Sequence, residues 1–205
     1  MRKLLVTTFM TLDGVMQAPG GPEEDTDGGF GLGGWSVNYW DDRMGEVMDG
    51  IMGKPFDLLL GRKTYEIFAA HWPNASEEEG AKPLNDATKY VASRSATPDE
   101  LTWDRSELLE GNVVEAVNRL KGTEGPELQI HGSANLLQSL HGSGLIDEYH
   151  IWTFPVVVGT GKRLFEQGSG PGALKLVDTV TSSTGVVIGT YAPAGEIETG
   201  SFALD

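Results

Sequence analysis

The sequence predicts an α/β protein with a mainly parallel central sheet, helices on both faces and an antiparallel hairpin at its C-terminal end. Short apolar runs alternate with segments in which apolar residues recur every three or four positions, as strands alternate with helices. The last two strand-like segments, 174–180 and 186–191, flank the small polar run 181–185, which is typical of a hairpin. The 205 residues suit a single domain, 1–205, and no segment resembles a linker.

Local patterns predict the first elements. Residues 4–9 form a short apolar run that contains threonine, which is typical of a buried strand. Residues 18–34 contain seven glycines, two prolines and four acidic residues, so we expect a long loop there. From Tyr39 onward the apolar residues recur with helical spacing, which predicts an amphipathic helix that Gly53 and Pro55 end.

Strands and helices then alternate along the middle of the chain. The expected order is strand 56–60, helix 64–70, loop 73–83, strand 87–92, helix 113–120 with Asn112 as N-cap, strand 127–131, helix 134–140 and strand 147–154. In sheets of this kind ligands bind at the carboxyl ends of the strands. The residues that follow these strands are therefore the first candidates for a functional site.

Composition excludes several classes of function. Fifteen Lys and Arg against thirty Asp and Glu give a formal charge of -15, which repels polyphosphate backbones and argues against a nucleic-acid partner. The chain has no cysteine, so disulfides and thiolate metal sites are excluded, and we expect no metal. No apolar run approaches the roughly 20 residues of a membrane span, and the N-terminal run is too short for a signal peptide. We therefore expect a soluble, cytoplasmic protein that does not bind membranes.

Two strand-to-helix junctions share one design, in which an apolar run is followed by glycine, small polar residues and a helical pattern. The first junction is Gly61, Arg62, Lys63 and Thr64, and the second is Gly132, Ser133, Ala134 and Asn135. A helix N-terminus has unpaired backbone N–H groups and the positive end of the helix dipole, so each junction is a candidate anion site. Singly, each also fits an ordinary helix start; together they predict a nucleotide-cofactor site.

Basic residues at strand ends support this interpretation. Ser93 and Arg94 follow a third predicted strand, and the pairs 62–63 and 162–163 also lie at or just beyond apolar runs. In so acidic a chain, such positive charge is informative. Arg62 and Lys63 are candidates for binding a ribose 2'-phosphate.

Two carboxylates are candidates for catalysis. Asp13 lies just beyond the first strand, where it faces a ligand or simply forms an Asp-Gly turn. Asp41 and Asp42 lie in the first turn of the helix near Tyr39, where the helix dipole alone explains acidic residues. The four histidines lack metal-binding spacing, so we expect them to be structural or surface residues.

These motifs resemble, in order, the cofactor-binding motifs of the dihydrofolate reductase-like superfamily. The segments that carry the resemblance are 60–66 (LGRKTYE), 91–94 (VASR) and 130–136 (IHGSANL). Residues 11–14 (TLDG), 147–150 (DEYH) and 154–165 (FPVVVGTGKRLF) are similar to one branch, the reductase domain at the C-terminus of the bifunctional riboflavin-biosynthesis deaminase-reductase. The similarity spans nearly the whole chain and implies a three-layer dihydrofolate reductase-like fold.

The resemblance also implies an NADPH site. Arg62, Lys63, Ser93 and Arg94 would hold the 2'-phosphoadenosine end, and Thr64 with residues 132–135 would hold the pyrophosphate. The glycine-rich loop 10–34 would flank the nicotinamide as a lid. Trp40, Met44 and Met48 would line the substrate pocket, although as helical apolar residues they suit the core equally well.

The function that these expectations favour is hydride transfer from NADPH to a C=N or C=O group of a small pyrimidine- or pterin-like heterocycle, similar to 5-amino-6-(5-phosphoribosylamino)uracil reductase. The proton would come from Asp13, Asp41 or an ordered water. The alternatives are a non-catalytic nucleotide-binding or sensor module on the same fold and, more weakly, a flavin enzyme. We also expect a possible homodimer, in which the apolar strand around 151–158 pairs across an interface.

Overall fold

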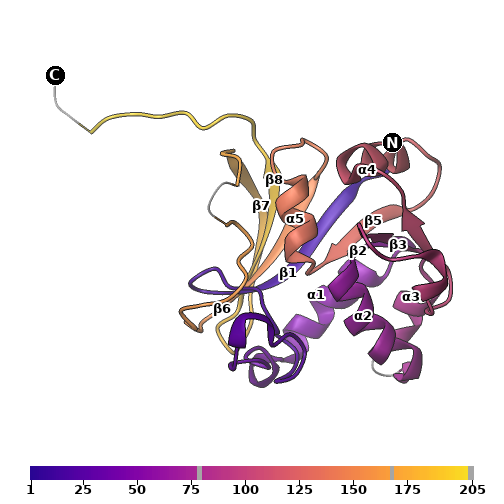
Figure 1. The fold of residues 1–205 in the computed structure, drawn as a ribbon. Helices are drawn as coiled ribbons and strands as arrows, with labels where there is room; N and C mark the ends of the chain where they lie inside the picture. Colours follow the sequence, from indigo (N-terminus) through magenta and orange to yellow (C-terminus); the bar gives the residue numbers. More distant parts are fainter. Residues whose placement is uncertain (78–79, 167–168, 203–205) are drawn as a thin grey trace.

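An eight-stranded sheet forms the centre of the computed structural model, which describes residues 1–77, 80–166 and 169–202 (Figure 1). The strands are β1 (Leu4–Thr11), β2 (Phe56–Gly61), β3 (Lys89–Ala92), β4 (Ser106–Leu109), β5 (Glu127–His131), β6 (Glu148–Phe154), β7 (Leu174–Thr181) and β8 (Val187–Pro193). The α-helices are α1 (Asp42–Met52), α2 (Arg62–His71), α3 (Ala81–Asp86), α4 (Val113–Lys121) and α5 (Ala134–Leu140).

The strands follow the order β4-β3-β2-β5-β1-β6-β8-β7. All neighbours from β4 to β6 are parallel, whereas β8 runs antiparallel to both β6 and β7. The predicted mainly parallel sheet with a closing antiparallel hairpin is therefore confirmed. Because β2, β3 and β5 are parallel and adjacent or nearly so, the residues that follow them meet at one edge of the sheet.

Helices cover both faces of the sheet, which gives three layers. On one face α4 and α5 pack against β1 and β5 through Leu4, Ile130, Val117 and Leu137, all at most 1% exposed. On the other face α2 and α3 pack against Leu58 and Leu60 of β2, and α1 packs through Met44 against Trp152 of β6. This second face carries the inner wall of the cavity described below.

Most predicted elements occur where the local pattern placed them. Strand 127–131 and helix 134–140 are found as expected, and Asn112 caps α4 by accepting hydrogen bonds from the N–H groups of Val114 and Glu115. Helix α2 begins two residues earlier than expected, so Arg62 and Lys63 lie in its first turn. A short 3-10 turn precedes α1, which begins at Asp42 with Asp41 as its N-cap.

Two elements lie outside the expected list. The loop expected at 73–83 contains a 3-10 turn and the start of α3, and β4 forms a short edge strand beside β3. Residues 78–79 of that loop lie outside the described part of the chain.

Strand β6 is an interior strand, paired with β1 on one side and β8 on the other. Its backbone N–H and C=O groups are used within the sheet, so pairing of β6 across a subunit interface is not possible. The backbone of 151–154 is therefore not open to a strand of a second copy, and the expected homodimer through 151–158 stays a prediction. Within the described residues, no helix combines the length and the apolar character needed to cross a membrane.

Candidate active site

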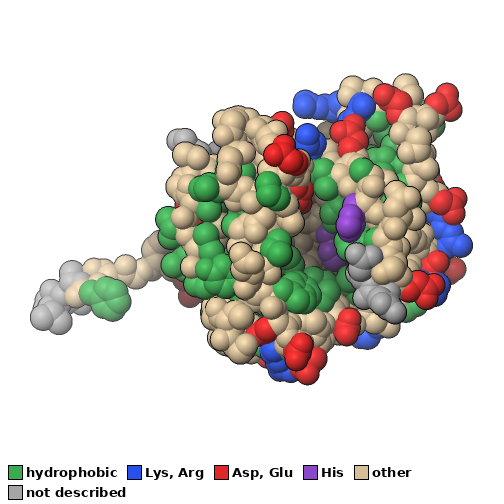
Figure 2. Space-filling model, turned by 90° about the horizontal axis from the view of Figure 1, so that it is seen from below, with side chains coloured by type: hydrophobic (Ala, Val, Ile, Leu, Met, Phe, Trp, Pro, Cys, Tyr) green, Lys and Arg blue, Asp and Glu red, His purple; other side chains and the backbone are tan. Residues whose placement is uncertain are grey.

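A cavity of about 1550 Å³ crosses the sheet at the carboxyl ends of β2, β3 and β5. Figure 2 shows the face that is hollowed there, with histidine atoms in the wall of the hollow. Four chain segments that end or follow strands contribute to the wall, namely 7–9 of β1, 61–64, 92–95 and 131–136. All ten residues predicted for cofactor binding line this cavity, and so do Trp40 and Met48 of the α1 region. Met44 is fully buried in the core instead.

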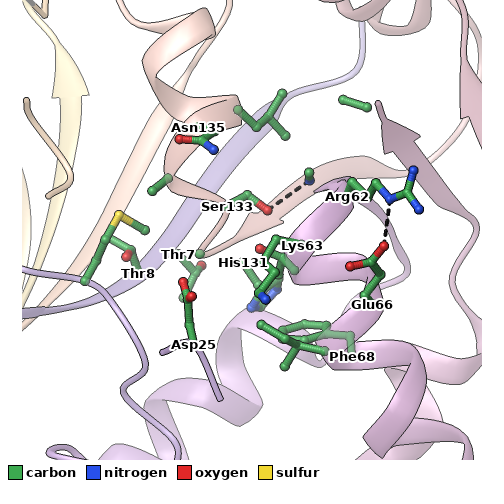
Figure 3. Close-up of a pocket in the computed structure, with 18 of the residues that line it drawn as sticks. Thr7, Thr8, Asp25, Arg62, Lys63, Glu66, Phe68, His131, Ser133 and Asn135 are labelled. Carbon is green, nitrogen blue, oxygen red and sulfur yellow. Dashed lines mark hydrogen bonds and ion pairs between the residues drawn. The ribbon is translucent and has the colours of Figure 1, made fainter. Parts of the chain in front are cut away.

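The two predicted junctions are joined directly by a hydrogen bond. The N–H of Gly61 donates to Oγ of Ser133 over 3.0 Å (Figure 3). Gly132 and Ser133 both adopt positive φ, of 65° and 62°, a conformation that costs a non-glycine residue about 1 kcal/mol. Such strain persists where surrounding contacts fix it and is common at functional sites. Here it turns the chain sharply from β5 into α5 and directs the Ser133 hydroxyl at the end of β2.

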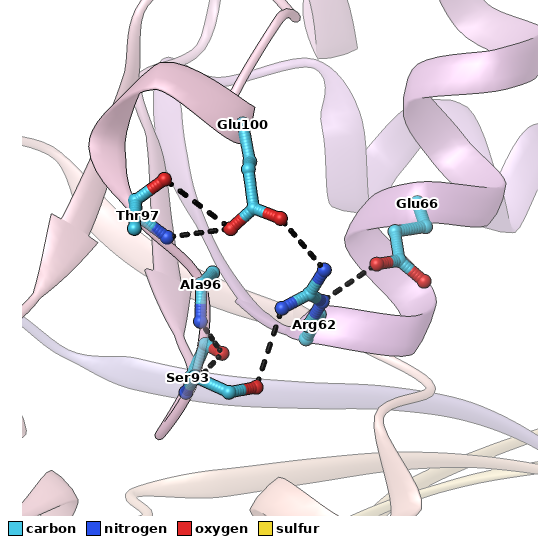
Figure 4. Close-up of polar contacts among 7 residues, drawn as sticks. Arg62, Glu66, Ser93, Ala96, Thr97 and Glu100 are labelled. Carbon is cyan, nitrogen blue, oxygen red and sulfur yellow. Dashed lines mark hydrogen bonds and ion pairs between the residues drawn. The ribbon is translucent and has the colours of Figure 1, made fainter.

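The outer end of the cavity carries the predicted cations, but Arg62 is already engaged. Its guanidinium donates to Glu66 at 2.7 Å, to Glu100 at 3.3 Å and to Ser95 at 3.2 Å (Figure 4). These contacts use three of the five N–H donors of the guanidinium. Two N–H donors of Arg62 therefore remain for an anion, but the carboxylates of Glu66 and Glu100 lie beside them.

Lys63 and Arg94 are the cations with capacity to spare. Both side chains are exposed at the cavity, and neither forms an ion pair or hydrogen bond with another described residue. Ser93 lies beside Arg94 and stabilises the turn after β3, where its Oγ accepts hydrogen bonds from the N–H groups of Ser95 and Ala96. The capacity to bind a phosphate thus rests mainly on Lys63 and Arg94.

The wall of the cavity carries equal numbers of basic and acidic residues, whereas the basic residues at the strand ends had predicted a positively charged cleft. Its described wall contains four cations (Arg62, Lys63, Arg94 and Lys162) and four acidic residues (Glu24, Asp25, Asp49 and Glu66). The predicted basic pair 162–163 is paired with acidic residues: Lys162 Nζ contacts Asp25 at 2.6 Å and Asp27 at 2.7 Å, and the guanidinium of Arg163 lies 3.7 Å from the carboxylate of Asp13. Positive charge is therefore local, at Lys63 and Arg94.

Lys162 instead holds the glycine-rich loop over the cavity. Besides its two ion pairs, the backbone N–H of Lys162 donates to Gln17, whose side-chain amide donates to the carbonyls of Asp25 and Asp27. The same loop places Glu24 in the cavity wall, where its carboxylate accepts hydrogen bonds from Gly20 and Gly21. Burial raises the pKa of Glu24, which suits this carboxyl to carry a proton.

The inner end of the cavity is aromatic and polar. Phe9 and Trp40 line it, and Trp40 stacks on the buried Trp152 with ring planes 5° apart. Beside them lie Thr7 of β1 and His131 of β5, two residues that the sequence did not indicate. The ring of His131 contacts Gln129 over 2.9 Å, and burial together with the neighbouring His150 lowers the pKa of His131 to about 4. His131 is therefore neutral at physiological pH.

The two predicted catalytic carboxylates lie elsewhere. Asp13 accepts hydrogen bonds from the hydroxyl of Thr11 and the N–H groups of Val158 and Gly159, which lower its pKa and join two loops. Asp41 caps α1 and accepts two hydrogen bonds from Ser183, which again lower its pKa. Neither residue belongs to the described wall of the cavity. A low pKa also makes a carboxyl a poor proton donor at neutral pH, so this geometry does not support the expected catalytic role of either residue.

Comparison with known proteins identifies the family of this chain. Residues 2–188 match the model of the RibD C-terminal domain family. The uncharacterized protein YyaP of Bacillus subtilis (strain 168) is 29% identical over 190 residues, which cover 91% of this chain and 92% of YyaP.

Two solved structures have a similar fold. A putative riboflavin biosynthesis protein from Shewanella sp. PV-4 superimposes with a TM-score of 0.69 at 19% identity, covering 94% of this chain and 99% of that one. Dihydrofolate reductase from Enterococcus faecalis, complexed with NADP(H) and RAB-propyl, gives a TM-score of 0.59 at 16% identity, with 93% and 96% of the two chains covered. The fold is thus dihydrofolate reductase-like, as the resemblance implied.

Proposed function

Since this chain belongs to the RibD C-terminal domain family, we propose that it is an NADPH-dependent reductase that transfers a hydride to a C=N or C=O group of a small heterocyclic substrate. One observation carries the proposal: a single cavity joins a phosphate-receptive outer end to an aromatic inner end. Its volume of about 1550 Å³ exceeds the roughly 300–1,000 Å³ of most small-ligand sites, so a dinucleotide and a small ring fit together.

The residues of the outer end suit the phosphates of NADPH. Lys63 and Arg94, with the two spare donors of Arg62, would bind the ribose 2'-phosphate. The first-turn N–H groups of α2 and the hydroxyl of Thr64 suit the pyrophosphate, as does the turn from Gly132 to Asn135. The donor set therefore fits the cofactor that the resemblance implied.

NADPH supplies the hydride when it is bound, and the protein orients the substrate and excludes water. Phe9 and Trp40 provide flat apolar surface for a ring at the inner end. The loop that Lys162 holds over the cavity restricts access of water. Glu24, the cavity carboxyl with a raised pKa, is our candidate for delivering the proton that must accompany the hydride.

A turnover assay tests this function. Oxidation of NADPH is followed by its absorbance across a panel of pterins, pyrimidines and quinones. We expect oxidation with at least one heterocycle, and slower oxidation by Glu24→Gln with unchanged NADPH affinity. Tight NADPH binding without oxidation across the panel would instead favour a nucleotide-binding or sensor module on the same fold.

A further inference from the structure

One side of the cavity is a groove between α1 and α2, which lie on the same face of the sheet (Figure 1). The wall residues of α1 recur every three or four positions and therefore share one face of that helix: Gly45, Met48, Asp49 and Met52. The wall residues from the second half of α2 and the turn after it are apolar: Ile67, Phe68 and Trp72. Figure 3 shows Phe68 among the residues that line the cavity. The two helices thus contribute to the wall of the same space.

The side chains of this groove are mostly apolar and only partly buried. Met52, Phe68 and Trp72 pack against the core cluster between the sheet and α2, yet each keeps part of its surface uncovered. Met48 does the same against the cluster beneath α1. A Cβ at Gly45 would meet no atom within 4 Å outside the local backbone, so the space at this point of α1 is open. Methionine and aromatic side chains adapt to apolar groups, and covering their surface from water is favourable in proportion to its area.

The charges around the groove disfavour an anionic ligand group. Asp49 is exposed on the α1 side, and its carboxylate forms no ion pair or hydrogen bond with another described residue. Lys162 is already ion-paired twice. The other cations of the described wall are Arg62, Lys63 and Arg94, which the proposed function assigns to the phosphates of the cofactor. Within the described wall, no cation therefore remains for a phosphate on the substrate.

We propose that the α1–α2 groove binds an apolar, uncharged arm of the substrate, attached to the heterocycle that accepts the hydride. This inference rests on the proposed function, because it places the ring at the inner end of the cavity, beside Phe9 and Trp40. The arm differs from the phosphoribosyl group of the substrate that the sequence resemblance suggested, since a phosphate in the groove would lie beside Asp49 with no cation to pair with. The substrate class is a small heterocycle with an aryl or alkyl substituent.

Calorimetric titration with three probes that share one ring tests the groove: 6-aminouracil, 6-(benzylamino)uracil and 6-[(4-phosphonobenzyl)amino]uracil. The titrations are made with saturating NADPH, so that Lys63 and Arg94 are occupied and cannot bind the phosphonate. In the native protein we expect the benzylamino compound to bind about tenfold more tightly than 6-aminouracil, because its phenyl ring covers apolar surface in the groove. The phosphonate should bind no more tightly than 6-aminouracil.

Two substitutions on α1 separate the charge of the groove from its apolar surface. Asp49→Lys should bind the phosphonate about tenfold more tightly than the native protein does, because a cation replaces the unpaired carboxylate. Glu46→Lys is the matched control, with the same charge change at an exposed residue of α1 outside the described cavity wall, and it should leave the affinity for the phosphonate unchanged. Met48→Gln should weaken the benzylamino compound severalfold but not 6-aminouracil, whereas a folding defect would weaken both.

Three results overturn the proposal: equal affinity of the native protein for 6-aminouracil and its benzyl derivative, tighter binding of the phosphonate than of the benzylamino compound, or no binding of any of the three probes. NADPH titration without a probe reports separately on the proposed function. If NADPH does not bind, the proposed function fails, and titration of 6-aminouracil and its benzyl derivative without NADPH still decides whether the groove binds an apolar arm.

Discussion

The depressed pKa of His131 makes a quantitative prediction about stability. Its pKa in the folded protein is about 4 against an ordinary value of 6.5, so the unfolded chain binds the proton more tightly between these two values. The free energy of unfolding therefore falls as the pH is lowered through this window. A pKa that differs by one between the folded and unfolded states corresponds to about 1.4 kcal/mol. Acidification from pH 7 to pH 5 therefore lowers the free energy of unfolding by about 2 kcal/mol through His131 alone.

His131→Asn removes this contribution while leaving a polar group beside Gln129. The measurement is urea unfolding at pH 7, 6 and 5, followed by tryptophan fluorescence, with stabilities compared at constant m-value. We expect the loss of stability between pH 7 and pH 5 to be about 2 kcal/mol smaller in the variant than in the native protein. The pKa of His141 is also lowered, but this residue titrates in both proteins and cancels in the difference. The pKa of the neighbouring His150 is lowered too, and loss of the repulsion from His131 in the variant changes the difference in the same direction.

His71→Asn is the matched control, because His71 is an exposed histidine at the end of α2. It should keep the native pH dependence. If His131→Asn also keeps it, His131 is not held neutral in the folded protein.

Three further predictions address the cofactor end, the loop and the predicted carboxylates. The double variant Glu66→Gln/Glu100→Gln should bind NADPH severalfold more tightly and NADH with unchanged affinity, because two carboxylates no longer compete for Arg62. Weaker NADPH binding in calorimetry would contradict this. Lys162→Ala should speed amide hydrogen exchange in residues 18–34, since the ion pairs with Asp25 and Asp27 are lost. The control Lys175→Ala, on the exposed strand β7, should leave this exchange unchanged. Unchanged exchange in Lys162→Ala would show that Lys162 does not hold the loop. Asp41→Ala should lower the free energy of unfolding by about 1–2 kcal/mol, because the N-cap of α1 is lost, and NADPH turnover should persist. Loss of turnover in a stable variant would instead support a catalytic role for Asp41.

The sequence predicted the junctions of this site well because they are local. A strand, a glycine and a helix start lie within ten residues, so the turns at 61–64 and 132–135 could be located without knowledge of the fold. The parallel order of the sheet then placed them at one edge. Strand β4 was missed because its four residues form an edge strand with partly exposed side chains, and α3 because it is short and contains Pro83.

What the sequence did not indicate depends on contacts between distant segments. Thr7 and His131 become neighbours in the cavity wall only through the register of β1 with β5. Glu100 reaches Arg62 from 38 residues away, so the guanidinium that resembled a free phosphate ligand is partly occupied. Asp13 and Asp41 follow the same rule, since their partners Gly159 and Ser183 lie more than 140 residues along the chain.

The central claim is that the cavity binds a 2'-phosphorylated dinucleotide through Lys63 and Arg94. The most direct measurement is calorimetric titration of the native protein and of the double variant Lys63→Ala/Arg94→Ala with NADPH and with NADH. The control is Arg43→Ala/Lys175→Ala, which changes the net charge equally at exposed residues outside the cavity wall. We expect the native protein to prefer NADPH, the cavity variant to lose about 2 kcal/mol, or roughly thirtyfold, with NADPH but little with NADH, and the control to match the native protein. Absence of NADPH binding by the native protein, or equal losses for both cofactors in the cavity variant, would contradict the account.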